Sequence, residues 1–261
     1  MEVIIQKSAA DARALSARLI ADALRAKPNL VLGLATGRTM EALYALLVRE
    51  HEQNGLDFSR AVTFNLDEYI GLEPSDPNSY RSYMNRHLFD KINIDPANTH
   101  LPNGVAPDLD AECDDYEARI KAVGGIDLQL LGIGRSGHVG FNEPLSAMRS
   151  RTRCKALTPE TIAQNGPLFG DPALMPRRAI TMGVGTILDA RRCITLVTGA
   201  EKADVLAKAV EGPITSMISA SALQLHTRCT VIVDEEAGAK LENTDHYRWI
   251  FTNEPEWEPY R

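Results

Sequence analysis

Short apolar runs alternate with amphipathic segments along this chain, and this alternation most constrains its fold. The apolar runs, which are typical of strands, lie at 3–6, 30–35, 61–66, 127–133, 179–183, 193–198 and 229–234. Segments with helical spacing of apolar residues lie at 8–26, 39–53, 79–91, 109–123 and 201–210. Ser8 and Asp108 are expected to cap two of these helices. The pattern predicts right-handed β-α-β units and a mostly parallel sheet with helices on both faces.

The length of 261 residues suits one domain spanning 1–261. We find no internal repeat, low-complexity segment or linker. The least regular section is 157–178, which contains Pro159, Pro167, Pro172 and Pro176. A long irregular segment inside a compact domain is usually a binding element. We therefore expect a single domain with an active-site lid at about 157–178.

Charge and composition exclude several classes of function. The net charge is −7 and the pI about 5.4, without a Lys/Arg run, so we expect no nucleic-acid partner. The sequence contains no stretch of 18 apolar residues, so we expect no membrane span. The four cysteines are isolated and no secretory signal precedes them, which indicates the cytoplasm. Without H-E-x-x-H or clustered His and Cys, we expect no metal.

The first of three notable strand ends is the segment GLATGRT at 33–39. Glycine and threonine lead directly from a strand into a helix, where exposed N–H groups bind anions. Arg38 could add a cation for a phosphate group. A plain strand-to-helix turn with a solvated Arg38 is the alternative.

The second strand end is TFNLDEY at 63–69, with two adjacent carboxylates, Asp67 and Glu68. Neighbouring side chains on an extended chain point in opposite directions, so only one would enter a cleft. We favour Asp67. A helix cap or a salt bridge is the alternative role.

The third strand end is DLQLLGIGRSGHVGFNEP at 127–144. Its Gly132, Gly134 and Gly137 spell G-x-G-x-x-G, but a dinucleotide loop belongs in the first β-α turn and opens a helix. This loop comes late and ends in a proline, so we expect no nucleotide cofactor. His138 and Glu143 can instead converge as an acid–base pair. A buried structural histidine is the alternative.

Nine motifs, in order from about residue 3 to 235, resemble the glucosamine-6-phosphate deaminase family, also called glucosamine-6-phosphate isomerase. They are GLATG, TFNLDEY, SYRSYM, LPNG, DAECDDYE, GHVGFNEP, SRTR, TMGVGTILDA and TGAEKA. The resemblance implies an α/β fold, a Rossmann-like three-layer sandwich. It also implies conversion of glucosamine 6-phosphate and water into fructose 6-phosphate and ammonium, without a cofactor.

The resemblance implies a catalytic set. Asp67 matches the base that moves a proton between C2 and C1 of the open-chain sugar. His138 matches the histidine that assists ring opening, and Glu143 matches its carboxylate partner. Ser136 stands where many relatives carry aspartate. Serine can form a hydrogen bond but supplies no charge, so Glu143 becomes the main negative charge beside His138.

The resemblance also implies a phosphate site, whose residues are Thr36, Gly37, Arg38, Thr39 and Lys202. Relatives carry a phosphate-binding arginine in the lid where this chain has Pro167, and a small residue where it has Arg38. We hypothesise that Arg38 supplies from the turn the cation that the lid has lost. Alternatively, Arg38 narrows the pocket for a different sugar phosphate.

Better-known members of the family are hexamers with an allosteric site for N-acetylglucosamine 6-phosphate. Ser146, Arg153 and Lys155 match that site, although a basic segment could equally be a solvated strand face. We expect a homo-oligomer, possibly a hexamer. Galactosamine 6-phosphate is an alternative substrate, because no residue above reads the C4 hydroxyl. A lactonase of the same superfamily would not need Asp67. A non-catalytic sugar-phosphate sensor is a further alternative.

Overall fold

A seven-stranded sheet forms the centre of the computed structural model, which describes residues 1–261. The strand order is β1-β10-β9-β6-β2-β3-β5, and every pair in it is parallel. The strands are β1 (Glu2–Gln6), β2 (Val31–Leu34), β3 (Val62–Asn65), β5 (Thr99–His100), β6 (Leu128–Leu131), β9 (Arg192–Val197) and β10 (Cys229–Asp234). The predicted mostly parallel sheet is confirmed.

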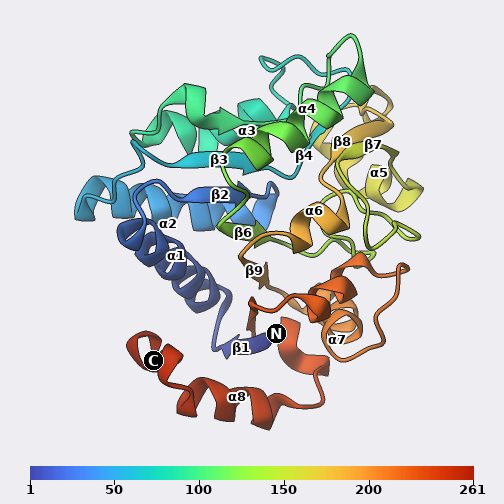
Figure 1. The fold of residues 1–261 in the computed structure, drawn as a ribbon. Coiled ribbons are helices and arrows are strands. Elements are labelled where there is room, and N and C mark those ends of the chain that lie inside the picture. The colour runs from blue at the N-terminus through green and yellow to red at the C-terminus, as the bar shows by residue number, and fades with distance from the viewer.

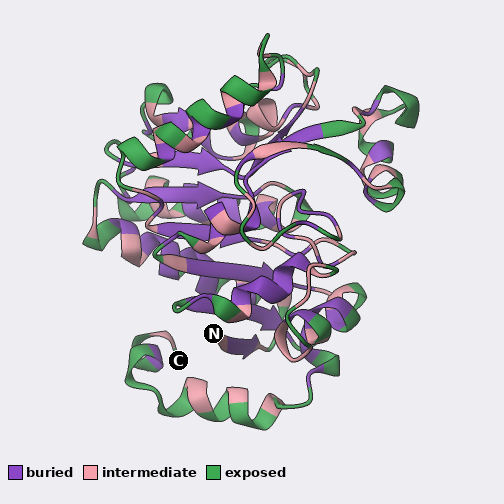
Figure 2. Ribbon diagram, turned by 45° about the vertical axis from the view of Figure 1, so that its right-hand side comes forward, coloured by how far each residue is buried: buried purple, intermediate pink, exposed green.

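Helices cover both faces of this sheet (Figure 1). They are α1 (Ala9–Ala26), α2 (Arg38–Asn54), α3 (Tyr80–His87), α4 (Leu109–Ala122), α5 (Pro159–Asn165), α6 (Val184–Leu188), α7 (Ala203–Val210) and α8 (Thr244–Asn253). The strands of this parallel sheet are largely buried, whereas the helices expose their outer sides (Figure 2). The two expected caps are confirmed, since the side chains of Ser8 and Asp108 accept backbone N–H groups of the first turns of α1 and α4.

A second, smaller sheet departs from the sequence prediction. It has the order β4-β8-β7 and is antiparallel, with β4 (Asp67–Tyr69), β7 (Arg153–Ala156) and β8 (Arg178–Thr181). The apolar run at 179–183 was expected to join the parallel sheet and instead forms most of β8. An apolar run does not encode which neighbour it pairs with, and here the partner is the short segment that follows β3.

Residues 157–178 connect β7 to β8 at the end of the molecule where the parallel strands terminate (Figure 1). They contain α5 and two short 3₁₀ turns, Gly166–Phe169 and Pro172–Leu174. Leu157 and Met175 from this segment pack with Tyr69 and Phe141 in a small apolar cluster separate from the main core. The segment therefore rests on the smaller sheet and on the loop after β6.

The helices of this structure are too short or too polar to cross a lipid bilayer. Because all seven parallel strands point the same way, the loops that follow β2, β3, β6 and β9 gather at one edge of the sheet. Ligands of open α/β sheets bind at that edge.

Candidate active site

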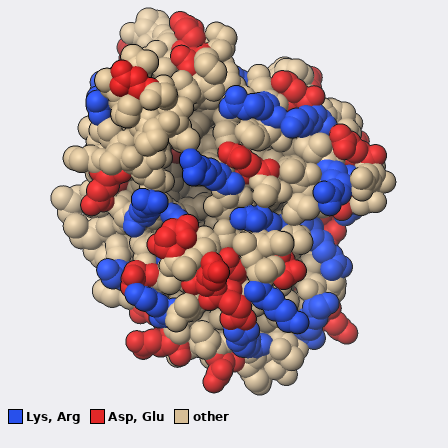
Figure 3. Space-filling view, turned by 180° about the vertical axis from the view of Figure 1, so that it is seen from behind, with Lys and Arg blue, Asp and Glu red and all other residues tan.

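A cavity of about 540 Å³ lies at the carboxyl ends of the parallel strands. The molecule is hollowed on the face shown in Figure 3, and Lys and Arg side chains lie along the rim of the hollow. The predicted site residues that line the cavity are Thr36, Gly37, Arg38, Thr39, Asp67, His138 and Lys202. The structure thus brings residues from four separate loops to one place.

Asp67 is the first residue of β4 and is only 5% exposed. No protein group donates a hydrogen bond to its carboxylate. Burial, helped by the neighbouring charge of Glu68, raises the pKa of Asp67 to about 8. A buried carboxyl group that faces a cavity without a partner is suited to exchanging protons with a bound molecule.

Glu68 points the other way, as alternation along a strand requires. Its carboxylate accepts the backbone N–H groups of Tyr69, Tyr80 and Arg81 at 2.8–3.0 Å. Two of these N–H groups belong to the first two residues of α3, so Glu68 caps that helix. Asp67 therefore faces the cavity and Glu68 caps a helix, which are the two roles considered for this acidic pair.

The glycines after β6 make room for His138. A Cβ atom on Gly134 would lie 2.0 Å from Nε2 of His138, so only glycine permits the imidazole to lie there. Gly137 has φ +82°, a left-handed conformation that also favours glycine. No helix follows this loop, because turns lead from it into β7. The G-x-G-x-x-G spacing thus accommodates a histidine ring.

His138 belongs to a three-residue polar network. Nδ1 of His138 lies 2.9 Å from Oε2 of Glu143 and 2.9 Å from Oγ of Ser136. The Ser136 hydroxyl also donates to Oε2 of Glu143 at 3.4 Å. Burial alone would raise the pKa of Glu143, but the hydrogen bond and charge of His138 outweigh it and lower that pKa to about 2. The carboxylate is therefore ionised at neutral pH, which places the proton on Nδ1 and leaves Nε2 free.

Thr181 of β8 ties the Asp67 strand to the histidine loop. It pairs with Asp67 across the smaller sheet, and its hydroxyl oxygen accepts the backbone N–H of Phe141 at 3.0 Å. A Cβ atom on Gly140 would lie 3.3 Å from Oδ2 of Asp67, so the loop backbone passes directly beside this carboxylate. The buried amide of Asn142 fixes the loop further by donating to the carbonyl of Met182 at 2.8 Å. The Asp67 carboxylate and the loop that carries His138 are therefore held in a fixed geometry relative to each other.

The turn before α2 faces the same cavity. Gly37 has φ +116° and precedes the 17-residue helix α2 without any side-chain cap, and Gly37 and the first residues of α2 line the cavity. Nζ of Lys202 donates to the carbonyl of Ile133 at 2.8 Å. Burial lowers the pKa of Lys202, with Glu201 opposing that effect. Arg38 is exposed and lines the cavity. This arrangement can hold a dianionic group.

The sequence analysis missed several residues of the cavity. Tyr69, Tyr80, Phe141 and Phe169 form a cluster of adjoining rings. Arg86 and Arg135 also line the cavity and add two cations. Tyr69 lay inside the motif TFNLDEY and Arg135 inside GIGRSG, so proximity to the predicted residues was the available signal.

The residues that match an allosteric site lie outside this cavity. The guanidinium of Arg153 donates to the buried hydroxyl of Ser146 at 3.1 Å. Lys155 lies two positions further along β7 and is exposed. The structure thus brings Ser146 and Arg153 together and places Lys155 on the same side of the strand.

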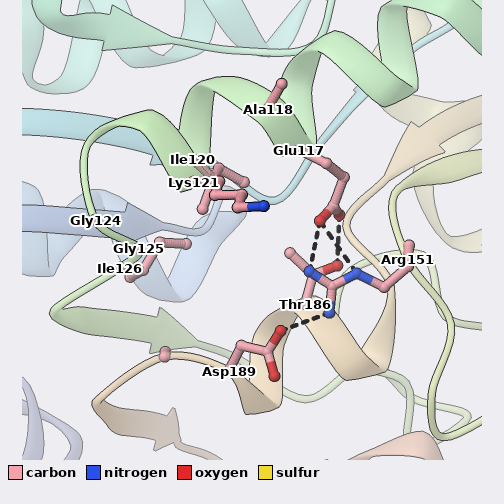
Figure 4. A pocket seen from close by; sticks show the side chains of 11 residues that line it. Glu117, Ala118, Ile120, Lys121, Gly124, Gly125, Ile126, Arg151, Thr186 and Asp189 are labelled. Carbon is pink, nitrogen blue, oxygen red and sulfur yellow. Dashed lines mark hydrogen bonds and ion pairs between the residues drawn. The ribbon is translucent and has the colours of Figure 1, made fainter.

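A second pocket of about 470 Å³ lies between α4 and α6 (Figure 4). Arg151 closes one side of it through ion pairs of 2.6 Å with Glu117 and with Asp189. Arg151 is therefore engaged and is not available as a free cation. None of the predicted site residues lines this pocket, and no group of three or more His, Cys, Asp or Glu side chains in the structure could hold a metal ion.

The fold and the site define an α/β protein in which a buried carboxyl group, a histidine paired with a second carboxylate, and the turn that begins a helix line one cavity. A profile of the family described as "Glucosamine-6-phosphate isomerases/6-phosphogluconolactonase" matches residues 5–232. The chain therefore belongs to this family.

Curated relatives and solved structures agree with this assignment. A protein of Hahella chejuensis named glucosamine-6-phosphate deaminase is 52% identical over 96% of this chain and 95% of its own length. A protein of an Arthrobacter species with the same name is 48% identical over 99% of both chains. A solved structure described as a monomeric glucosamine-6-phosphate deaminase has a TM-score of 0.90 at 43% identity, covering 92% of this chain and all of that one. A 6-phosphogluconolactonase of Trypanosoma cruzi, 22% identical with a TM-score of 0.74, shares the fold.

Proposed function

We propose that this protein converts glucosamine 6-phosphate and water into fructose 6-phosphate and ammonium. The observation that carries the proposal is the unpartnered carboxyl group of Asp67 in the same cavity as His138, whose Nδ1 pairs with Glu143. The relatives that are about half identical to the chain bear the name of this activity. The proposal therefore rests on a site that fits proton transfer at carbon and on relatives that are named for this activity.

His138 assists ring opening in this proposal. Opening the pyranose requires a proton to leave the C1 hydroxyl and another to reach the ring oxygen. Nε2 of His138 is the nitrogen without a protein partner, so it can accept the hydroxyl proton. Glu143 accepts a hydrogen bond from Nδ1 at 2.9 Å and stabilises the charged imidazole that results. Ser136 shares the same nitrogen and supports that orientation.

Asp67 acts on the open-chain sugar. Its carboxylate removes the proton at C2 and returns it to C1, while the C2 ammonium group loses a proton and the aldehyde oxygen gains one. The aldehyde carbon thereby becomes a CH₂OH group and C2 becomes a protonated imine. Water then adds at C2 and ammonia leaves, which gives the ketose and, with a proton, ammonium. A carboxyl group with a pKa near 8 is a stronger base than an exposed aspartate and suits this transfer.

The helix-opening turn binds the phosphate group in this proposal. The N–H groups after Gly37, the hydroxyls of Thr36 and Thr39, and the ammonium of Lys202 supply donors and charge. Residues 157–178 act as the lid of a single domain, because Asn165 and Phe169 of that segment line the cavity. Holding the phosphate away from the reacting carbon provides binding energy and orientation.

Arg38→Gly should raise KM for the sugar phosphate about ten-fold or more and change kcat little. Arg38 is exposed at the cavity and forms no ion pair that would hold it elsewhere, so its charge is available to the phosphate. Initial rates over a range of substrate concentrations measure both constants. Arg60→Gly, which removes an exposed arginine remote from the cavity, is the matched control. An unchanged KM in Arg38→Gly would show that the cation comes from another residue.

Ammonium release from purified protein tests the proposed function. The protein should release ammonium from glucosamine 6-phosphate and form an equal amount of fructose 6-phosphate. Galactosamine 6-phosphate in a parallel reaction tests the alternative epimer, and the faster of the two identifies the substrate. Binding of either sugar phosphate without ammonium release would support the sensor instead.

A homo-oligomer, possibly a hexamer, stays a prediction, and so does location in the cytoplasm. The solved relative with 43% identity is described as monomeric. Light scattering on the purified chain should give a multiple of the 28.6 kDa chain mass. A mass of one chain at all concentrations would contradict the prediction.

The Ser146–Arg153–Lys155 group is proposed as an effector site for N-acetylglucosamine 6-phosphate, and a solvated strand face is the alternative. The contact between Arg153 and Ser146 supports an anion site at this place. Saturation curves measured with and without the acetylated sugar phosphate distinguish the two. A curve that does not change would favour the solvated face.

A further inference from the structure

The two oxygens of the Glu143 carboxylate have different partners. Oε2 faces Nδ1 of His138 at 2.9 Å. Oε1 accepts a hydrogen bond from the hydroxyl of Thr161, a residue of α5 that is only 5% exposed. Glu143 itself is 4% exposed, so water cannot replace a lost partner without rearrangement. The orientation of the carboxylate is thus fixed from both ends.

The hydroxyl of Thr161 has its own direction fixed by Thr158, the N-cap of α5. The Thr158 hydroxyl accepts the backbone N–H of Thr161 at 3.3 Å and lies 3.2 Å from its side-chain oxygen, to which it donates. That donation fills the acceptor side of the Thr161 hydroxyl and leaves its hydrogen for Glu143. A chain of hydrogen bonds therefore runs from the start of α5 to the imidazole of His138.

The far end of α5 also meets the cavity. The side-chain amide of Asn165 donates to the hydroxyl of Tyr69 at 3.1 Å, and both residues line the cavity. The helix is therefore joined to the site at two points, through Thr161 to the Glu143 carboxylate and through Asn165 to the Tyr69 hydroxyl.

We propose that Thr161 is a positioning residue for the ring-opening pair, whose hydroxyl holds the Glu143 carboxylate with Oε2 directed at Nδ1 of His138. This inference rests on the proposed function, because that function assigns ring opening to Glu143 and His138. Glu143 in turn keeps the proton on Nδ1 and Nε2 free for the sugar. Thr161 thereby connects the 157–178 segment to the chemistry without touching the substrate.

The kinetic test uses Thr161→Val, which keeps the shape and removes the hydroxyl, and Thr161→Ser, which keeps the hydroxyl. A buried carboxylate that loses this donor is unsatisfied and is no longer held with Oε2 facing Nδ1 of His138, so kcat should fall about 10- to 100-fold in the valine variant. KM should stay within about three-fold, because the phosphate site does not change. Thr161→Ser should recover kcat to within about three-fold of the wild-type value. Glu160→Gln, an exposed neighbour in α5, is the matched control and should leave both constants unchanged.

A second measurement does not need turnover. Nitrogen-15 NMR of the neutral imidazole reports which nitrogen carries the proton. The wild-type protein should show His138 protonated on Nδ1, and Thr161→Val should show a larger share protonated on Nε2. If the valine variant does not fold, Thr161→Ala carries the same two tests.

The outcomes separate this inference from the proposed function. A lowered kcat with rescue by serine and a changed His138 spectrum supports the positioning role. A wild-type kcat or an unchanged His138 spectrum in the folded valine variant overturns it. If wild-type protein releases no ammonium, the proposed function fails, and the spectrum still decides whether Thr161 sets the orientation of the pair.

Discussion

We expect Asp67→Asn to lower kcat for ammonium release by about 10²- to 10⁴-fold, the usual contribution of a general base. Asparagine has the same shape, so the cavity and the phosphate turn should be preserved. It cannot accept the C2 proton, and the adjacent carboxylate of Glu68 is occupied by the N–H groups at the start of α3. Proton transfer at carbon should therefore stop while binding continues.

Proton nuclear magnetic resonance of the product provides the decisive measurement for this variant. In deuterated water, transfer by one base places the C2 hydrogen or a solvent deuteron at C1, and Asp67→Asn should produce neither species at a measurable rate. Calorimetry should show substrate binding within a few-fold of wild type. Asp114→Asn, the same change on the exposed surface of α4, is the control. Near-wild-type turnover in Asp67→Asn would assign the base to another group.

The same substitution should stabilise the fold at alkaline pH. The pKa of Asp67 is raised from 3.8 to about 8 in the folded protein, so folding favours the neutral acid. Its ionisation costs stability progressively as pH rises from about 4 to about 8. Asp67→Asn removes that cost, with a gain on the order of a few kcal/mol at pH 8 and almost none at pH 4. Thermal unfolding at the two pH values measures the difference.

The raised pKa of Asp67 also explains what the pH profile of the wild-type protein should show. The base must be ionised, so kcat/KM should rise with pH and level off near 8, the pKa in the free protein. A bound ammonium group on the sugar would favour the carboxylate, so the corresponding limb of kcat should lie at lower pH. A flat profile between pH 6 and 8 would contradict the value of about 8.

The sequence predicted the parallel sheet because that information is local. Apolar runs such as 127–133 and 193–198 end in turn residues, and caps such as Ser8 accept N–H groups only three positions away. The smaller sheet was not predicted, because β4 is three residues long and pairs with a strand more than 100 positions later. Nothing in the residues 67–69 encodes that partner.

The residues of the candidate site were likewise predicted where the information is local and missed where it is not. Alternation along a strand indicated that only one of Asp67 and Glu68 would enter a cleft, and the glycine-rich loop was enough to single out His138. Thr161 escaped notice, because its contact with Glu143 spans 18 positions and depends on how α5 packs. The sequence analysis treated 157–178 as irregular and did not predict α5, which begins in the segment T-P-E-T. The hydrogen bond from Thr161 to Glu143 is visible only in the folded structure.

Glu143→Gln should lower kcat about 100-fold, because the site requires two acceptors at this position. Oε1 of Glu143 accepts the Thr161 hydroxyl and Oε2 accepts the proton on Nδ1 of His138. A glutamine amide offers one acceptor and one donor, so one of these hydrogen bonds must be lost. The amide also removes the charge that stabilises a protonated imidazole, and the usual worth of a charged hydrogen-bond partner gives the magnitude.

Binding separates this effect from a general loss of structure. The reduced, open-chain amino alditol 6-phosphate cannot form a ring, so its affinity should be the same for Glu143→Gln and wild type. Glu160→Gln makes the same chemical change at an exposed position of α5 and should leave kcat unchanged. Turnover of Glu143→Gln within two-fold of wild type would exclude a role for this carboxylate in ring opening. The hydrogen bond and charge of His138 lower the pKa of Glu143 to about 2, so the folded site favours the charged carboxylate that glutamine cannot supply.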